Sequence, residues 1–253
     1  MVKIGGSTLG SHDTTIEDLV TLQKKGLSPV VVHGGGQTVS QWLGRLGIST
    51  MFVRGKRVTD MDSLSVVVAV LAGLVNKELV AAINALGGRA AGLSGIDGCL
   101  IEAGIADPEL GYVGDITNIN LELLDSVKAA GYIPVIAPVG YYRTDSSDDV
   151  RFLNVNADTA AGAVAAALGA ESLVFLTDVA GICDGSGVLI PGLSKEEARG
   201  LIADGVVDGG MIPKVEACLV ALSSVSVTRI IDGRAEHALL NEVEGSNEGT
   251  TIK

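Results

Sequence analysis

The sequence predicts an α/β protein with a buried, largely parallel sheet, and three observations support this prediction. First, 47% of the 253 residues are hydrophobic but only 3% are aromatic, so aliphatic side chains packed between layers have to build the core. Second, short apolar runs alternate with helical patterns along most of the chain, which is typical of βα units. Third, the 34 glycines are about twice the usual ~7% and indicate many tight turns or close backbone approaches.

The first part of the chain contains two strand and helix pairs. Residues 2–4 are predicted as the first strand. The segment 16–25 has apolar side chains at helical spacing and is followed by Gly26, a common helix stop. The apolar run 29–33 is predicted as the second strand, and 37–46 as the helix after it.

A hairpin and a long helix are predicted next. Residues 52–58 have the pattern of a hairpin around Gly55. Asp60 is a suitable N-cap for a helix that extends to Leu86, before two consecutive glycines. The segment GYIPVIAPV, residues 131–139, is predicted as another buried strand.

The last third of the chain repeats the alternation of helices and strands. An Ala-rich helix at 156–170 precedes a strand at 172–179. A helix at 195–203, another that begins within 208–222, and a last strand at 226–232 follow. No internal repeat or linker interrupts the pattern, and the best candidate boundary between two lobes lies near residue 170.

Charge and composition exclude several classes of partner. Lys and Arg number 18 against 30 Asp and Glu, the net charge is -12, and no basic run occurs, so nucleic-acid and anionic-membrane surfaces are not expected. The three cysteines are odd in number and widely spaced, as in proteins of a reducing compartment. The N-terminus lacks a signal-peptide pattern, and the longest apolar run, 66–75, is about half of the ~20 residues of a membrane span. A cytoplasmic protein is therefore expected.

Two glycine clusters stand where predicted strands end: KIGGS at 3–7 and HGGG at 33–36. Ligands of open α/β sheets bind beyond the carboxyl ends of the strands, where glycine lets backbone N–H groups approach an anion. A single cluster would more simply permit a tight turn. Two clusters in similar positions favour a phosphate or oxyanion site.

Two lysines occupy unusual positions. Lys3 lies within an apolar strand, where a cation is costly unless it meets an anion. Lys214 lies near the start of a helix, where the helix dipole disfavours positive charge. Each also fits a surface lysine whose aliphatic stem is buried. Together they suggest phosphoryl transfer, in which cations neutralise the charge of the moving group.

Polar residues near the Ala-rich helix are further candidates. Asn156 is predicted as the N-cap of that helix, which leaves Asn154 and Asp158 as additional polar groups. A carboxylate at 158 could hold two lysines in place. Arg57 is a candidate for a two-pronged grip on a substrate carboxylate, although a hairpin arginine is commonly solvated.

His33 and the acidic turns give weaker signals. A lone histidine at a strand end is more often structural than catalytic, and no obvious nucleophile accompanies it. Acidic residues in the glycine-rich turns 94–98 and 177–187 could serve a nucleotide or Mg²⁺. Neither turn has a specific metal-ligand spacing, and no metal-binding side chains are predicted.

The chain resembles the amino acid kinase family through nearly its whole length. Each motif is weak alone, whereas the ordered set is specific. The motifs that carry the resemblance are KIGGS, VVHGGG, RVT, LVNKELV, GLSGIDG, GYIPVIAPV, NVNADTAA, LTDVAGI, GGMIPKVEACL, IIDGRAEHALL and the closing GTTI.

The resemblance implies a fold and an activity. The fold is a three-layer αβα sandwich with a mainly parallel central sheet, formed by residues 1–253 as one domain. Residues 1–170 are expected to bind an acylated amino acid and residues 171–253 to bind ATP. The implied reaction transfers the γ-phosphate of ATP, with Mg²⁺, to the side-chain carboxylate of N-acetyl-L-glutamate in arginine synthesis. A homodimer formed through the long helix after Asp60 is also implied.

The resemblance also implies roles for individual residues. Lys3 and Lys214 are expected to stabilise the transferring phosphoryl group, and Asp158 to orient both. Arg57 and Asn154 are expected to hold the α-carboxylate of the substrate. Backbone N–H groups would come from Gly5, Gly6, Gly35 and Gly36. The residues that match nucleotide-binding stretches are Asp178, Val179, Ala180, Gly181, Ile182, Cys183, Val206, Val207 and Asp208.

This chemistry needs no general base. A glutamate side chain, with a pKa near ~4.3, is already ionised at pH 7. His33 is therefore expected to be a structural neighbour of the site and not a base.

The sequence is compatible with two alternative functions and departs from the family pattern at its N-terminus. A related kinase could act on an amino acid attached to an acidic carrier protein, but a net charge of -12 offers little basic surface for it. A non-catalytic sensor or storage protein on this fold would be favoured only if Lys3, Asp158 or Lys214 were missing. Arginine-inhibited members of the family carry an extra N-terminal helix, and since Met1 directly precedes the first strand, neither hexamers nor arginine feedback is expected.

Overall fold

The structure, a computed structural model, describes residues 1–5, 14–53, 56–143, 151–246 and 248–253. Its β-strands are β1 (Val2–Ile4), β2 (Val31–His33), β3 (Phe52–Val53), β4 (Lys56–Arg57), β5 (Ala90–Gly95), β6 (Ile101–Ile105), β7 (Val113–Ile119), β8 (Ile133–Tyr141), β9 (Phe152–Val155), β10 (Ser172–Thr177), β11 (Gly192–Leu193), β12 (Val227–Asp232) and β13 (Thr250–Ile252). The α-helices are α1 (Thr15–Lys24), α2 (Gly36–Arg45), α3 (Met61–Val68), α4 (Asn76–Ala85), α5 (Glu122–Ala129), α6 (Ala157–Leu168), α7 (Lys195–Ala203), α8 (Ile212–Ala221) and α9 (Ala238–Val243). Short helical segments are η1 (Ala69–Val75), η2 (Asp97–Cys99), η3 (Pro108–Leu110) and η4 (Gly209–Met211).

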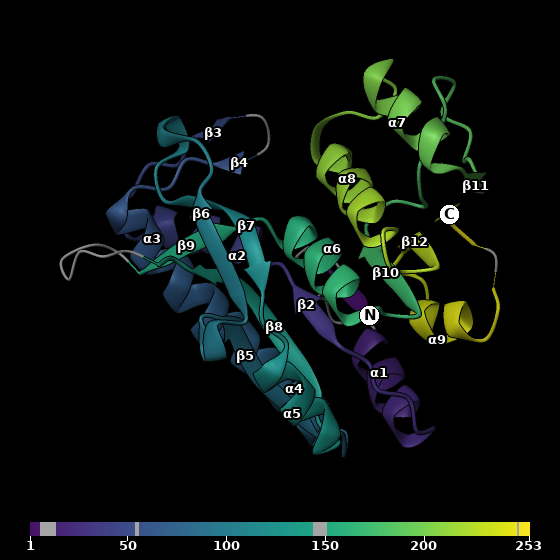
Figure 1. The fold of residues 1–253 in the computed structure, drawn as a ribbon, viewed down its shortest axis with the longest axis horizontal. Helices are drawn as coiled ribbons and strands as arrows, with labels where there is room; N and C mark the ends of the chain where they lie inside the picture. Colours follow the sequence, from purple (N-terminus) through teal and green to yellow (C-terminus); the bar gives the residue numbers. More distant parts are fainter. Residues whose placement is uncertain (6–13, 54–55, 144–150, 247) are drawn as a thin grey trace.

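Among the described residues, eleven strands form one sheet and β3 and β4 form a separate two-stranded sheet. The large sheet extends across both halves of the protein (Figure 1). Its order is β11-β13-β12-β10-β1-β2-β8-β6-β7-β9, and β5 also pairs with β8. The central strands β12, β10, β1, β2, β8 and β5 are parallel to their neighbours in this list. Their carboxyl ends therefore lie along one edge of the sheet, where ligands of α/β proteins bind.

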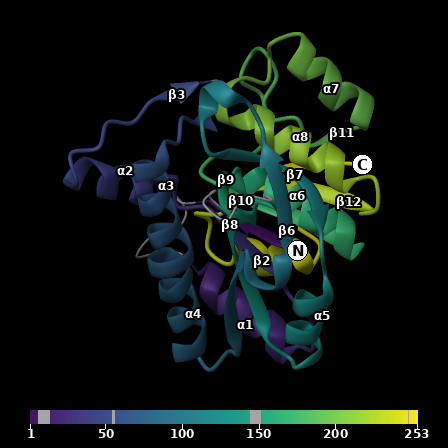
Figure 2. The ribbon, with the colours of Figure 1, turned by 60° about the vertical axis from the view of Figure 1, so that its left-hand side comes forward.

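Helices cover both faces of the sheet, which confirms the predicted three-layer αβα sandwich. One hydrophobic cluster packs α1, α2, the long helix α3–η1–α4 and α9 against one face. A second cluster packs α5, α6, α7 and α8 against the other. Figure 2 shows α4 and α5 on opposite sides of the strands. The aliphatic composition suits this arrangement, because the sheet is buried on both faces.

The long helix from Met61 to Ala85 is continuous and includes a π-helical segment, η1. Asp60 caps it as predicted, because its side chain accepts a hydrogen bond from the Ser63 N–H at 2.8 Å. Among the described residues, this helix is the one that is long and apolar enough to cross a membrane. The apolar run 66–75, on which the sequence-based expectation rested, is by itself too short for a span. The buried side of the helix, including Val67 and Leu79, packs against the sheet as a core helix does.

Most predicted elements are confirmed within a few residues. The helix predicted at 195–203 has the same bounds in the structure. The predicted cap Asn156 accepts hydrogen bonds from the N–H groups of Asp158 and Thr159, and Gly169 ends α6 in the left-handed conformation. The hairpin at 52–58 is formed by β3 and β4, whereas its predicted centre, Gly55, lies outside the described residues.

Candidate active site

Two lysines share one buried carboxylate at the carboxyl edge of the sheet. Lys3 Nζ lies 2.7 Å from Asp158 Oδ1, and Lys214 Nζ lies 3.1 Å from Asp158 Oδ2. Lys3 and Asp158 are only 5% and 6% exposed. The Lys214 ammonium also donates to the Gly210 carbonyl at 3.1 Å. Each carboxylate oxygen thus holds one ammonium group, and neither lysine is a simple surface residue.

Strand geometry explains how Lys3 reaches this position. In β1, Val2 and Ile4 belong to the cluster beneath the long helix, so Lys3 points to the opposite face. That face is covered by α6, whose first turn carries Asp158. Because the Asn156 cap satisfies the N–H groups of this turn, the Asp158 side chain remains available for the lysines.

The site favours the ionised form of Asp158. Burial opposes ionisation, but the charges and hydrogen bonds of Lys3 and Lys214 outweigh burial and lower the pKa of Asp158. Burial also lowers the pKa of Lys3, an effect that the Asp158 charge opposes. With a carboxylate only 2.7 Å from its Nζ, we assign Lys3 as the charged member of an ion pair at neutral pH.

Arg57 presents a buried cationic group from β4. It is 8% exposed, its Nη2 donates to the Gly36 carbonyl at 3.1 Å and to Ser40 Oγ at 2.7 Å, and its guanidinium carbon lies 4.6 Å from the Phe52 ring centre. In contrast, its buried Nη1 has no hydrogen-bond partner in the described part of the chain. Burial lowers the pKa of Arg57. An unpaired buried guanidinium nitrogen is costly, and an anionic ligand would remove that cost.

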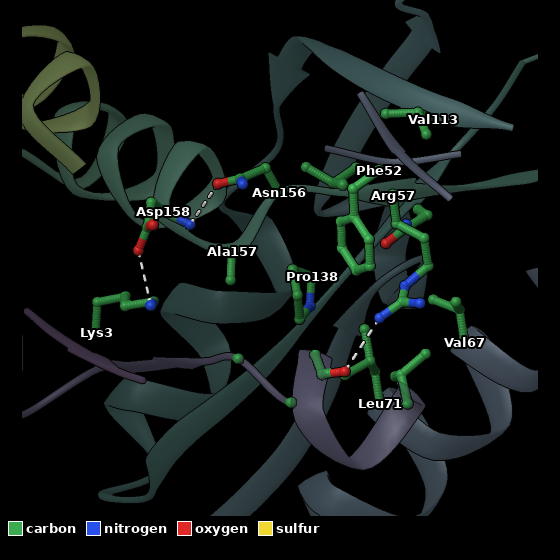
Figure 3. Close-up of a pocket in the computed structure, with 16 residues that line it drawn as sticks. Lys3, Phe52, Arg57, Val67, Leu71, Val113, Pro138, Asn156, Ala157 and Asp158 are labelled. Carbon is green, nitrogen blue, oxygen red and sulfur yellow. Dashed lines mark hydrogen bonds and ion pairs between the residues drawn. The ribbon is translucent and has the colours of Figure 1, made fainter. Parts of the chain in front are cut away.

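A cavity of about 240 Å³ connects Arg57 with the lysine site. Figure 3 shows Arg57 and Lys3 on different sides of this cavity, with Pro138 and Ala157 between them. Its lining also includes Phe52, Val67, Leu71, Val113, Asn154 and the glycines 34–36. The cavity therefore has cationic groups at two places and an apolar wall, which suits a small molecule with two anionic ends.

Several predicted site residues lie together around this cavity. Gly35, Gly36, Arg57 and Asn154 line it, in addition to the buried pair described above. Asn154, on β9, donates from Nδ2 to Thr59 Oγ1 at 3.1 Å. The predicted substrate-binding residues thus come from α2, β4 and β9, which are far apart in the sequence.

The first glycine cluster differs from the prediction. The Gly5 N–H donates to the Leu176 carbonyl at 3.2 Å, so this donor is engaged within the sheet, and Gly5 does not line the cavity. Gly6 lies outside the described residues.

The predicted nucleotide-binding stretches do not line this cavity either. Residues 178–183 follow β10 at the carboxyl edge of the sheet. Residues 206–208 directly precede η4, and η4 leads into α8, which carries Lys214. Ala180 lines a second cavity, of about 330 Å³. The loop is well anchored, because the Ile182 N–H donates to Thr250 Oγ1 at 2.8 Å.

The acidic turns have local structural roles. Asp97 Oδ2 accepts hydrogen bonds from the N–H and Oγ of Ser94, at 2.6 and 2.9 Å. Asp184 Oδ1 similarly accepts from the N–H groups of Ser186 and Val188. Asp97 and Asp184 do not line the cavity around Lys3, whereas the charge of Asp178, in the second turn, raises the pKa of Lys3 against the larger lowering by burial.

Sequence reasoning missed the residues that support Arg57 and the glycines. Ser40 lies one helical turn after Gly36, and Phe52 lies across the hairpin from Arg57. Leu71 lines the cavity from the π-helical segment. The four-residue spacing between Gly36 and Ser40 could have indicated that both lie on one face of the helix, whereas nothing in the helical pattern marks Leu71.

Comparison with known proteins assigns the family. Residues 1–232 match the amino acid kinase family. A protein of Dehalococcoides mccartyi named acetylglutamate kinase is 47% identical over 253 residues, which cover 100% of this chain and 93% of that protein. The chain belongs to the amino acid kinase family.

Solved structures agree with this assignment. The Streptococcus mutans protein smu.665 superposes on this amino acid kinase with a TM-score of 0.84 and 28% identity, over 100% of this chain and 97% of the other. N-acetylglutamate synthase from Neisseria gonorrhoeae, solved with coenzyme A and N-acetyl-glutamate, gives a TM-score of 0.83 and 27% identity. That match covers 99% of this chain and 58% of the synthase.

Proposed function

We propose that this amino acid kinase transfers the γ-phosphate of ATP to the side-chain carboxylate of N-acetyl-L-glutamate, forming N-acetyl-L-glutamyl 5-phosphate in arginine biosynthesis. The observation that carries the proposal is the cavity with Arg57 at one side, whose Nη1 has no hydrogen-bond partner among the residues that the structure describes, and Lys3 at another. A substrate with two carboxylates can pair one with Arg57 and direct the other toward the lysines. The relative named acetylglutamate kinase, 47% identical over the whole chain, supports the same substrate.

The proposed mechanism depends on position and charge. The attacking carboxylate is ionised at neutral pH, so no base has to remove a proton from it. The cavity brings this anion to the γ-phosphate of ATP, and its cations offset the repulsion between the two. The carboxylate oxygen forms the new bond to phosphorus, and the bond from phosphorus to the ADP oxygen breaks.

Each charged group has a distinct part in this proposal. Lys3 and Lys214 stabilise the negative charge on the transferring phosphoryl group, and Asp158 fixes the distance between them. The N–H groups of Gly35 and Gly36, at the start of α2, add hydrogen bonds to the same oxygens. Asn154 assists Arg57 in holding the α-carboxylate.

ATP is proposed to bind to the half formed by residues 171–253, through residues 178–183 and 206–208. Both stretches lie near the lysine site: one follows β10, the strand next to β1, and the other precedes α8, which carries Lys214. Among the described residues no three His, Cys, Asp or Glu side chains form a metal-binding group. We therefore propose that Mg²⁺ binds through the phosphates of ATP, where it would neutralise part of their charge.

The protein is also proposed to act as a cytoplasmic homodimer. The long helix keeps an exposed side that includes Ala69, Gly73, Leu74 and Ala81. Small and apolar residues on an exposed helix face allow close packing against a second copy.

The pH dependence follows from the absence of a base. Burial lowers the pKa of His33 to about 4, so this histidine does not titrate between pH 6 and 8. We expect kcat/KM for N-acetyl-L-glutamate to change less than about two-fold between pH ~6 and ~8. If kcat/KM instead falls at low pH with an apparent pKa near ~6.5, an essential histidine base is indicated and the mechanism is contradicted.

Arg57→Lys is expected to raise KM for N-acetyl-L-glutamate by about 10- to 100-fold, because one hydrogen bond to a charged group contributes about 1.5–3 kcal/mol. The turnover number should fall much less, since Arg57 is remote from the transferring group. Arg45→Lys is a matched control, because Arg45 is exposed and its guanidinium carbon lies 5.5 Å from the centre of the Trp42 ring, outside the cavity lining. Equal KM values in the two variants would show that Arg57 does not bind the substrate.

The proposed activity is tested by trapping the acyl phosphate. The purified protein is incubated with MgATP, hydroxylamine and one of four acceptors: N-acetyl-L-glutamate, glutamate, aspartate or N-acetyl-aminoadipate. The proposal predicts ATP-dependent hydroxamate with a clear preference for N-acetyl-L-glutamate. Without this preference the proposed substrate is wrong.

A further inference from the structure

His33 is buried behind the glycine loop and its ring makes two specific contacts. It is 0% exposed at the end of β2. Its Nδ1 lies 2.7 Å from the Gly34 carbonyl oxygen, and its Nε2 lies 3.2 Å from Asn76 Nδ2. Asn76 begins α4 and is also fully buried, on the face of the sheet opposite to Lys3. The mechanism above uses neither residue.

Asn76 determines which ring nitrogen of His33 carries the proton. The Asn76 amide nitrogen lies 2.8 Å from the Val135 carbonyl and 3.2 Å from the Leu93 carbonyl, and only an N–H donor can satisfy these oxygens. The two hydrogens of this NH₂ group serve the two carbonyls, so a proton on His33 Nε2, which lies 3.2 Å from Asn76 Nδ2, would face another donor. The proton is therefore on Nδ1, where it donates to the Gly34 carbonyl.

Two further observations agree with this assignment. Lys77 Nζ donates to Asn76 Oδ1 at 3.0 Å, so the two ends of the amide are correctly distinguished. Burial lowers the pKa of His33 to about 4, and the nearby charges of Lys3 and Lys77 also lower it. The ring is therefore neutral at pH 7 and carries a single proton.

The His33 contact fixes the orientation of a peptide group in the cavity wall. In a trans peptide the C=O of one residue and the N–H of the next point in opposite directions, and no described peptide bond is cis. Since the Gly34 carbonyl points to the buried ring, the Gly35 N–H points away from the ring. Residues 34–36 line the cavity, so a Gly35 N–H that points away from the ring can donate to a ligand bound there.

The long helix holds the same loop from behind. Gly35 has φ 153°, a conformation that favours glycine, and a Cβ there would lie 2.6 Å from Leu71 Cδ2 and 3.4 Å from Val75 Cγ2. Leu71 and Val75 belong to the π-helical segment directly before Asn76. Glycine is thus required at 35, and the loop rests on helix side chains while His33 sets its peptide orientation.

We propose that His33 and Asn76 are positioning residues for phosphoryl transfer: Asn76 holds His33 with its proton on Nδ1, and His33 directs the Gly35 N–H at an oxygen of the transferring phosphoryl group or the attacking carboxylate. The identity of that oxygen rests on the proposed function. The network itself rests on the contacts above.

The kinetic test compares two substitutions that each preserve half of the network. In His33→Asn, the amide nitrogen can occupy the place of Nδ1 and still donate to the Gly34 carbonyl. In His33→Gln, the side chain reaches the place of Nε2 and loses this donor. We expect His33→Gln to lower kcat by about 10- to 100-fold with KM for both substrates within about three-fold, and His33→Asn to stay within about three-fold of the unsubstituted enzyme.

His237→Gln is the matched control, because His237 is 41% exposed and pairs with Asp18 away from the cavity. It should leave kcat unchanged. Two outcomes would overturn the proposal: a kcat of His33→Gln within about three-fold of the unsubstituted enzyme, or equal losses in both His33 variants.

A measurement on the unsubstituted protein separates this inference from the proposed function and needs no variant to fold. Nitrogen-15 NMR of the ring distinguishes a proton on Nδ1 from one on Nε2. We expect His33 to be neutral with the proton on Nδ1. If no acyl phosphate forms, the proposed function fails while these spectra still support the positioning. A proton on Nε2 would overturn it.

Discussion

An Asp158→Asn variant is expected to lose about 3–5 kcal/mol of unfolding free energy and at least about 10²-fold in turnover. The Asp158 carboxylate contacts the ammonium groups of Lys3 and Lys214 at 2.7 and 3.1 Å, and the side chains of Lys3 and Asp158 are 7% and 8% exposed. A neutral amide cannot offset two ammonium groups in this buried position. Urea unfolding and the hydroxamate assay measure the two effects.

The acid dependence of stability gives this prediction a second readout. Because the pKa of Asp158 is lowered in the folded state, its contribution to stability is present above the unfolded pKa of ~3.9 and is lost as pH falls through the folded pKa. The stability of the Asp158→Asn variant should therefore decrease less on acidification than that of the unsubstituted protein. Asp125→Asn is the control, since Asp125 pairs with Lys128 at 3.6 Å on the surface. Similar stability of the two variants would contradict the assigned ion-pair network.

Lys214→Ala is expected to lower kcat by about 10²-fold or more, with a modest effect on KM for either substrate. The ammonium group is held by Asp158 and the Gly210 carbonyl, so it is fixed before substrate binds. A group fixed in this way stabilises charge that develops only in the transition state.

Lys25→Ala is the matched control for Lys214→Ala. Lys25 forms an exposed ion pair with Glu244, which contributes little to stability and is not part of the cavity. The Lys25→Ala variant should retain full activity. Near-normal turnover in Lys214→Ala would remove Lys214 from the catalytic machinery.

The sequence predicted those parts of the fold that depend on local patterns. Apolar runs and helix caps identified β1, β2, β10 and most helices, including the Asp60 and Asn156 caps. The strands β5 to β7 were not predicted, because segments such as AAGLSG and VGDITNI contain small and polar residues without strict alternation. Their pairing with β8 and with each other stabilises them in the folded protein.

The site was partly predictable for a similar reason. A lysine in an apolar strand requires a nearby anion, and this requirement pointed to Lys3 without any knowledge of the fold. The identity of its partner depends on the packing of α6 over β1, which local patterns do not give. Asn76 lies within the LVNKELV motif but was given no role, since a polar residue in a helical pattern usually faces solvent and here it is fully buried.

The most direct test of the proposed site is a crystal structure with N-acetyl-L-glutamate and a non-hydrolysable ATP analogue. We expect an α-carboxylate oxygen to accept a hydrogen bond from Arg57 Nη1, and the side-chain carboxylate and the γ-phosphate to lie between Lys3 and Lys214. Substrate bound in another cavity, with Arg57 Nη1 still unpaired, would contradict it.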